Sequence, residues 1–149
     1  MWNLNTDERL RHWRHFRKEI STKSLESALK DTVNLWSYAP YVSHYLHPLD
    51  VSDWPDPWTL VHENYYCDLA KSLGMFYTLY LSDHYKNSVS DLEIRIYSGN
   101  LDQFNTVWVN RGKYILNLEF NAIVNKSSIT DDLKLESTVS IDQLKLDLQ

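Results

Sequence analysis

Residues 62 to 81 read HENYYCDLAKSLGMFYTLYL, and this stretch decides the predicted fold. Apolar or small residues recur at helical spacing on two faces, Leu69, Leu73, Phe76 and Tyr80 on one and Ala70, Gly74 and Tyr77 on the other. A helix that is apolar on both sides is expected to be buried. We therefore expect a central buried helix that begins between His62 and Tyr65, ends near Leu81, and carries Cys67 in its first turn.

The apolar pattern changes to period two after the polar residues 84 to 91. Apolar and polar side chains alternate in LEIRIY, residues 92 to 97, as is typical of a half-buried strand. Two further strands are predicted at residues 107 to 109 and 113 to 124, joined by a turn through NRG at 110 to 112. The longer strand is expected to place Tyr114, Leu116, Leu118 and Phe120 on one face. These strands should form an antiparallel sheet against the buried helix.

The residues before the buried helix predict two more helices and an ordered loop. A first helix is expected over residues 6 to 20 and a second over residues 22 to 38, where Pro40 stops it. The loop that follows holds all four prolines, and we expect its WPDPW segment at 54 to 58 to pack as a corner over the start of the buried helix.

The order of elements, helices first and strands afterwards, predicts an α+β fold. The tail carries Leu133, Leu135, Leu144, Leu146 and Leu148, which predict short strands or a strand and a helical turn. We expect one domain over residues 1–149. Its parts are a helical segment 1–38, the aromatic and proline-rich loop 39–61, a helix and sheet core 62–124, and an acidic C-terminal segment 125–149.

Composition excludes several classes of function. The 149 residues include three widely separated glycines, so the chain has no Gly-rich phosphate loop. A net charge of -5 opposes binding to nucleic acid or to an anionic membrane, and a single cysteine excludes an internal disulfide. Five basic residues of the first helix, Arg9, Arg11, Arg14, Arg17 and Lys18, are expected to form a solvated face. We expect a cytoplasmic protein, or a virion protein if a phage encodes it.

Cys67 is the residue with the most pointed chemistry. A helix N-terminus favours the thiolate, but a cysteine nucleophile also needs a base, usually histidine, within hydrogen-bond reach. His84 would lie about 25 Å away along one continuous helix, so it is excluded as that base. Three histidines before the helix remain as candidates, namely His44, His47 and His62. Burial of Cys67 as a small apolar side chain is the alternative to a reactive thiol.

Other residue clusters point to structure rather than to chemistry. The pairs His12 and His15, and His44 and His47, have spacing compatible with a metal but lack further ligands, so we expect neither metal nor cofactor. Asp53 and Asp56 are expected to cap turns. Among the many aromatic residues, the candidates for a binding surface are Trp54, Trp58, Tyr66 and Trp108, with core packing as the alternative.

Several short motifs together resemble the transglutaminase-like superfamily, which has a papain-like fold, and most closely its bacterial transglutaminase-like cysteine proteinases. They are WPDPWTL at 54 to 60, CDLA at 67 to 70 opening a helix, VWV at 107 to 109, the turn at Gly112, and YILN at 114 to 117. The resemblance covers residues 54 to 121, and SITDDL at 128 to 133 is similar to the closing segment of that family.

The resemblance assigns Cys67 to the nucleophile position and Asn117 to the position of the orienting aspartate. The chain reads QFNT at 103 to 106, so Asn105 or Thr106 stands where the family has its histidine. Neither side chain is a base near neutral pH. The resemblance thus implies the fold without the activity.

The function expected from this resemblance is a catalytically inactive domain that serves as a binding or assembly module for a protein partner, and its small size suggests a viral or phage origin. The rival is a cysteine hydrolase or acyl transferase in which Cys67 attacks a carbonyl and a loop histidine replaces the missing one. A nucleic-acid accessory role for the first helix is the weakest alternative.

Overall fold

The computed structural model describes residues 1–146 and confirms the α+β class. The helices are α1 (Thr6–Ser21), α2 (Leu25–Ser37), α3 (Pro57–Glu63) and α4 (Asp68–Tyr80). The strands are β1 (Leu92–Ser98), β2 (Gln103–Val109), β3 (Tyr114–Leu116), β4 (Ile123–Val124) and β5 (Lys134–Val139). Single turns of 3-10 helix lie at Val51–Asp53, Lys126–Ser128 and Ile141–Gln143.

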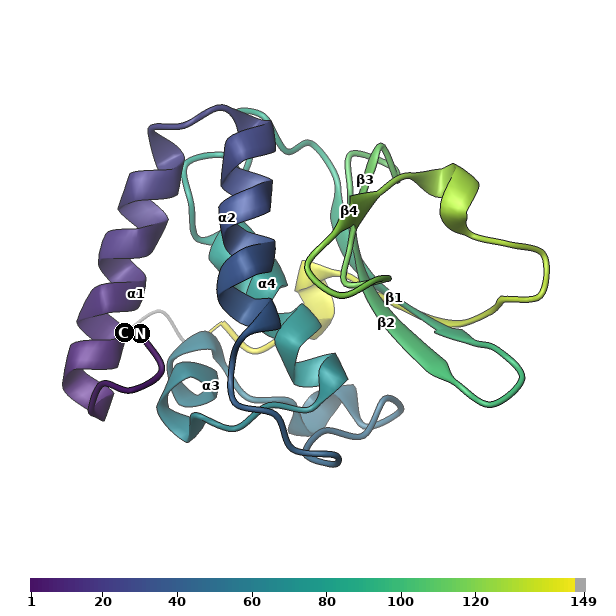
Figure 1. Ribbon diagram of the computed structural model, residues 1–149, viewed down its shortest axis with the longest axis horizontal. Helices are drawn as coiled ribbons and strands as arrows, with labels where there is room; N and C mark the ends of the chain where they lie inside the picture. The colour runs from purple at the N-terminus through teal and green to yellow at the C-terminus, as the bar shows by residue number, and fades with distance from the viewer. Residues whose placement is uncertain (147–149) are drawn as a thin grey trace.

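The five strands form one antiparallel sheet in the order β4-β3-β2-β1-β5. The hairpin of β1 and β2 pairs Leu92 with Val109 and Ser98 with Gln103. Figure 1 shows α4 between the other helices on one side and the sheet on the other. The central, buried position expected for the helix after Cys67 and the antiparallel pairing of the strands are therefore confirmed.

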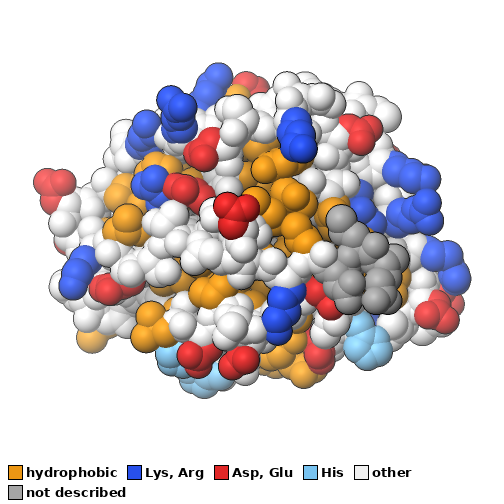
Figure 2. Space-filling view, turned by 180° about the vertical axis from the view of Figure 1, so that it is seen from behind, with side chains coloured by type: hydrophobic (Ala, Val, Ile, Leu, Met, Phe, Trp, Pro, Cys, Tyr) orange, Lys and Arg blue, Asp and Glu red, His pale blue; other side chains and the backbone are white. Residues whose placement is uncertain are grey.

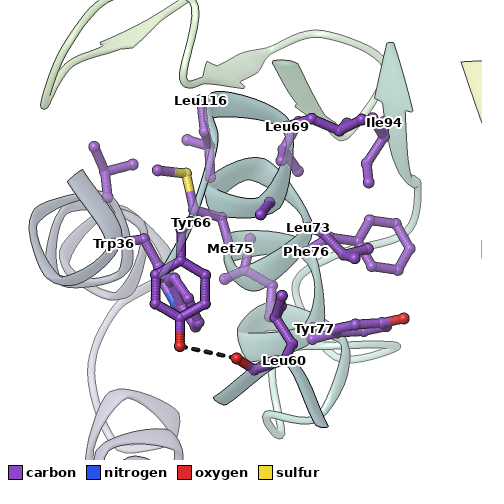
Figure 3. Packing of buried hydrophobic residues seen from close by; sticks show 14 of the residues in the cluster. Trp36, Leu60, Tyr66, Leu69, Leu73, Met75, Phe76, Tyr77, Ile94 and Leu116 are labelled. Atoms are coloured by element: carbon purple, nitrogen blue, oxygen red, sulfur yellow. Dashed lines mark hydrogen bonds between the residues drawn. The ribbon is translucent and has the colours of Figure 1, made fainter. Parts of the chain in front are cut away.

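Helix α4 is buried along almost its whole length because apolar side chains surround it (Figure 3). On the side of α2, the ring of Trp36 lies so close to Gly74 that a Cβ there would be 2.5 Å from three ring atoms. The indole Nε1 groups of Trp13 and Trp36 both donate to Thr78 Oγ1, at 3.0 and 2.9 Å. This hydroxyl therefore joins α1 and α2 to α4.

The sheet buries apolar side chains on both faces. One face contributes Ile94, Ile96, Val107, Val109 and Leu116 to the main core around α4. On the other face Tyr97, Trp108 and Ile115 form a second cluster, against which Ile129 and Leu133 of the C-terminal segment pack. The guanidinium of Arg95 lies 3.9 Å from the ring centroid of Trp108 on this second face.

The start of the buried helix differs from the prediction. A separate helix, α3, occupies residues 57 to 63, because Pro57 fits the first helical position and the Asp56 carboxylate accepts a hydrogen bond from Thr59 N. Asn64 adopts the left-handed conformation with φ 56° and ends it. As a result Cys67 is the residue that caps α4 rather than part of its first turn.

Three other predicted features of the helical half need correction. Helix α2 begins at Leu25 rather than at residue 22, because the Ser24 side chain caps it by accepting from Ser27 N. The WPDPW corner contacts α4 at Tyr77, whose hydroxyl donates to Pro55 O at 2.7 Å, and not at the start of the helix. Arg9 does not belong to a solvated face.

Arg9 is buried and donates through its Nε and NH2 groups to the carbonyls of Val61 and His62, at 2.9 and 3.1 Å. These carbonyls lie in the last turn of α3, where backbone acceptors lack helical partners. The side chain therefore ties α1 to the end of α3, which requires that it leave the solvent.

The predicted strand over residues 113 to 124 is wrong in its length. It ends at Leu116 because Asn117 and Asn121 have left-handed backbones, with φ of 67° and 50°, and only Ile123–Val124 resumes pairing. Leu118 consequently packs on the second cluster, while Phe120 is exposed. The turn through 110 to 112 does join β2 to β3. The tail forms a strand and a helical turn as expected, with Leu148 outside the described residues.

Candidate functional site at the head of helix α4

The loop from 64 to 67 sets the position of Cys67. Tyr66 N donates to Pro40 O at 2.8 Å and Tyr66 O accepts from Val42 N at 3.0 Å, a short parallel bridge. The Tyr66 hydroxyl donates to Leu60 O at 2.9 Å, the dashed contact in Figure 3. Cys67 is thereby held at the N-cap of α4, where it is buried and its thiol makes no capping hydrogen bond.

Polar side chains from three elements meet beside Cys67. Asn105 of β2 faces α4, and its Nδ2 donates to Asp68 Oδ2 at 2.8 Å. Its Oδ1 accepts from Gln103 Nε2, also at 2.8 Å. We call Asp68, Gln103, Asn105 and Asn117 the amide cluster. Both ends of the Asn105 carboxamide are therefore occupied by contacts within this cluster.

Asn117 closes the amide cluster from the other side. Its Nδ2 donates to the backbone carbonyl of Asn105 at 2.9 Å and lies 3.3 Å from Asp68 Oδ1. Asparagine tolerates the left-handed backbone that ends β3 here, and this conformation turns the side chain toward the head of α4. The residue that stops the strand thus also completes the cluster.

Asp68 is the hub of the amide cluster. Desolvation by its surroundings raises the pKa of this carboxyl, while the hydrogen bonds from Asn105 and Asn117 act in the opposite direction. Lys71, one turn further on, lies near enough to favour the carboxylate as well. The cluster is therefore a carboxylate held by amide donors, an arrangement without an imidazole.

Two cavities flank the amide cluster. One, of about 240 Å³, is lined by Cys67 together with loop residues that include His44 and Pro48. The other, of about 380 Å³, is lined by Asn117, Lys71 and Phe120 among others. Both cavities include Tyr41, Asp68 and Gln103, so they are adjacent. Together they form what we call the head groove.

Exposed aromatic side chains border the head groove. Tyr38, Tyr41 and Phe120 have 62%, 65% and 67% of their surfaces exposed, which is unusual for large rings. Tyr38 and Phe120 meet edge to face, with ring centroids 5.3 Å apart. Lys71 Nζ lies 5.7 Å from the ring centroid of Tyr41. The groove therefore offers apolar rings beside polar groups.

The histidines considered as a base for Cys67 lie in different parts of the structure. His44 lines the cavity at Cys67, whereas His47 and His62 do not. His47 instead accepts a hydrogen bond from Leu49 N through Nδ1. His84 is buried elsewhere, with Nε2 at 2.9 Å from Ile20 O. The side chain of Thr106 points to the other face of the sheet and donates to Arg95 O, so Asn105 is the β2 residue that faces the head of α4.

The four aromatic residues considered for a binding surface are mostly internal. Trp54, Tyr66 and Trp108 are buried, and a buried ring presents no face to a ligand, which argues against the expected binding role. Trp58 is partly exposed and packs edge to face on Trp13 at 5.6 Å. The accessible positions are occupied instead by Tyr41, which no sequence pattern singled out, and by Phe120, which was expected on the face of a strand.

The four helices and the five-stranded antiparallel sheet form an α+β fold that is consistent with a transglutaminase-like fold. A solved structure with a similar fold is calcium-bound LapG of Legionella pneumophila, a transglutaminase-like cysteine protease, with a TM-score of 0.70 and 14% sequence identity. The similarity covers 93% of this chain and 78% of LapG. The sequence matches no protein-family profile and no curated protein.

The residues present do not reproduce an evident metal centre. Across residues 1–146, no group of three or more His, Cys, Asp or Glu side chains could hold a metal ion. None of the helices described is long and apolar enough to cross a membrane.

Proposed function

We propose that this chain is a catalytically silent transglutaminase-like domain that binds an extended segment of a protein partner in the head groove. The observation that carries the proposal is the identity and bonding of Asn105. A carboxamide is not a base near neutral pH, and this one already donates to Asp68 and accepts from Gln103. It can neither take the thiol proton nor turn toward a substrate without breaking the amide cluster.

Asn117 supports the same conclusion. In a cysteine hydrolase the third residue orients an imidazole behind the nucleophile. Here Asn117 donates to Asp68 and to the Asn105 carbonyl, so its amide serves to hold α4 against β2 and β3. The amide cluster therefore connects α4 to β2 and to the end of β3 through hydrogen bonds.

The edge of β2 supports binding of an extended segment. Strand β3 pairs only with Val107, Trp108 and Val109, so in the described chain no strand pairs with residues 103 to 106 on that side. The Asn105 carbonyl on this side already accepts from Asn117 Nδ2, so an added strand would pair with the other backbone groups of the edge. An extended peptide in this position would lie in the head groove, beside the rings of Tyr41 and Phe120.

Thiol reactivity tests the catalytic silence. We expect iodoacetamide to modify Cys67 no faster than a free thiol between about pH 6 and about pH 9, because no imidazolium stabilises the thiolate. Asn105→His should increase the rate near neutral pH, and Asn105→Gln is the matched control that should not. Rapid modification of the wild-type thiol at about pH 6 would contradict the proposal.

Binding is tested with a peptide selected on the wild-type protein from a random library. We expect Phe120→Ala or Tyr41→Ala to lower the affinity for this peptide by about tenfold, because each substitution removes an exposed ring of the groove. Leu49→Ala is the control, since Leu49 is 75% exposed but does not line either cavity. Equal affinity for all variants would exclude the groove as the binding site.

One observation favours a second candidate, a cysteine hydrolase or acyl transferase: His44 lines the same cavity as Cys67. In that reaction His44 would take the thiol proton, the sulfur would bond to a carbonyl carbon, and the leaving group would depart with the proton. This candidate predicts a fast wild-type thiol whose reactivity falls in His44→Ala. The same alkylation series therefore separates the two functions.

A further inference from the structure

A further cavity lies away from the head groove, between α1 and α3. Its volume is about 550 Å³ and it is lined by Leu10, Arg11, Arg14, Arg17 and Trp58. Figure 2 shows Lys and Arg side chains gathered at the right margin of that view, the end of the molecule formed by α1. We call the cavity lined by Leu10, Arg11, Arg14, Arg17 and Trp58 the arginine cavity. It combines three guanidinium groups with an apolar floor.

Arg17 is held inward within the arginine cavity. Its guanidinium carbon lies 4.3 Å from the ring centroid of Trp13 and 5.4 Å from that of Trp58. Its Nε is buried and has no hydrogen-bond acceptor among residues 1–146. Because Nε is closed to solvent, a carboxylate or phosphate oxygen that enters the cavity would contact the other nitrogens of these guanidinium groups.

Acidic side chains do not neutralise these arginines in the described part of the chain. The salt bridges found there involve Lys23, His47, Arg95 and Lys134. The Glu8 carboxylate of α1 accepts instead from Asn5 at the helix start. Arg11, Arg14 and Arg17 have no acidic partner within residues 1–146, and in a chain with net charge -5 they form a local site for an anion.

We propose that the arginine cavity binds an acidic peptide segment of a partner. Its carboxylates would accept from Arg11, Arg14 and Arg17, and an apolar side chain between them would contact Leu10 and Trp58. Two features favour a peptide over nucleic acid. The apolar floor suits a side chain, and three arginines within one cavity match a short acidic segment better than a continuous phosphate backbone.

The probe that tests this site is a fluorescein-labelled peptide of glutamates around a central phenylalanine, followed by anisotropy. We expect Arg14→Glu to weaken binding by about tenfold or more, because it removes a charge-assisted contact and adds a repulsive charge. Lys18→Glu is the matched control, an exposed residue of α1 with the same change of charge that does not line the cavity. It should weaken binding by less than about threefold, since it adds the same charge one helical turn from Arg14 but removes no contact in the cavity.

Three further binding measurements can exclude the arginine cavity as the binding site. Phe120→Ala should leave this binding unchanged, which keeps the result independent of the head groove. A counterpart peptide with glutamine in place of glutamate should not bind. Equal loss in Arg14→Glu and Lys18→Glu would mean unspecific attraction, and tighter binding of oligothymidylate than of the peptide would assign the surface to nucleic acid. Either result, or no binding of the glutamate peptide, overturns the proposal.

Discussion

The middle of α4 and its head are held by different kinds of contact. Around Gly74 and Thr78 the helix is fully buried, with Trp36 pressed against its backbone and two indoles donating to one hydroxyl. At the head, Asp68 receives amide hydrogen bonds at the rim of a groove that opens to solvent. A polar group in the middle of α4 that loses its hydrogen-bond partner cannot bind water instead, whereas a polar group at the head of the helix can.

This difference separates stability from chemistry. A buried polar group that loses its partner keeps the full cost of its desolvation, so substitutions in the middle should affect unfolding most. At the head water can replace a lost partner, so stability should change little while the thiol environment changes. Three substitutions test this contrast.

Thr78→Val should have the largest effect on stability, about 2–4 kcal/mol, because it leaves the indole N–H groups of Trp13 and Trp36 buried without an acceptor. Thr32→Val is the matched control, since the Thr32 hydroxyl is equally buried but only donates to Ala28 O. Urea unfolding of both variants measures the difference. Equal losses would show that the shared acceptor adds nothing.

Gly74→Ala should destabilise by about 1–3 kcal/mol, because the new Cβ would overlap the Trp36 ring and force α2 away from α4. At Gly99 an added Cβ would meet its nearest atom at 3.4 Å, an ordinary contact. Gly99→Ala is therefore the comparison variant, expected to unfold at nearly the wild-type urea concentration. If Gly74→Ala and Gly99→Ala unfold at the same urea concentration, the close packing of Trp36 on α4 does not determine stability.

The smallest effect is expected at Asp68. Its folded-state pKa is raised above the ordinary 3.8, so the carboxyl favours the folded state when protonated and that contribution is lost as pH rises through the folded pKa. Relative to Asp68→Asn, the wild type should lose stability as the pH rises above the ordinary pKa of 3.8, with a shallow slope because the residue is more than one-third exposed. Urea unfolding at several pH values measures this. A slope of opposite sign would mean that the amide donors outweigh desolvation.

Periodicity in the sequence was sufficient to place α4 and β1, because each residue's burial there follows from its own position in a helix or strand. The ends of α3 at Asn64 and of β3 at Asn117 could not be predicted from periodicity. Asn64 Nδ2 donates to Trp2 O, and Asn117 donates to Asp68, so both turns are completed by residues far away in the chain. An asparagine in the sequence does not reveal such a distant partner.

The candidate site was predictable in its positions but not in its bonding. Motif order placed Cys67, Asn105 and Asn117 together, and the structure brings them to the head of α4. The role of Asp68 as hub and of Gln103 as donor to Asn105 arises only when β2 lies against the helix. Tyr41 gave no periodic signal, and the period-two pattern placed Phe120 in a strand that ends before it. Both residues lie in irregular segments whose exposure depends on the completed fold.

The single hydroxyl shared by Trp13 and Trp36 also constrains how the chain folds. Thr78 follows Trp13 by 65 residues and Trp36 by 42, so the contact closes two long loops at one atom. Such non-local contacts form slowly compared with the helices themselves. Formation of α1 and α2 therefore does not complete the helical half, and the two indoles should reach their native fluorescence together, in the step at which all three helices dock.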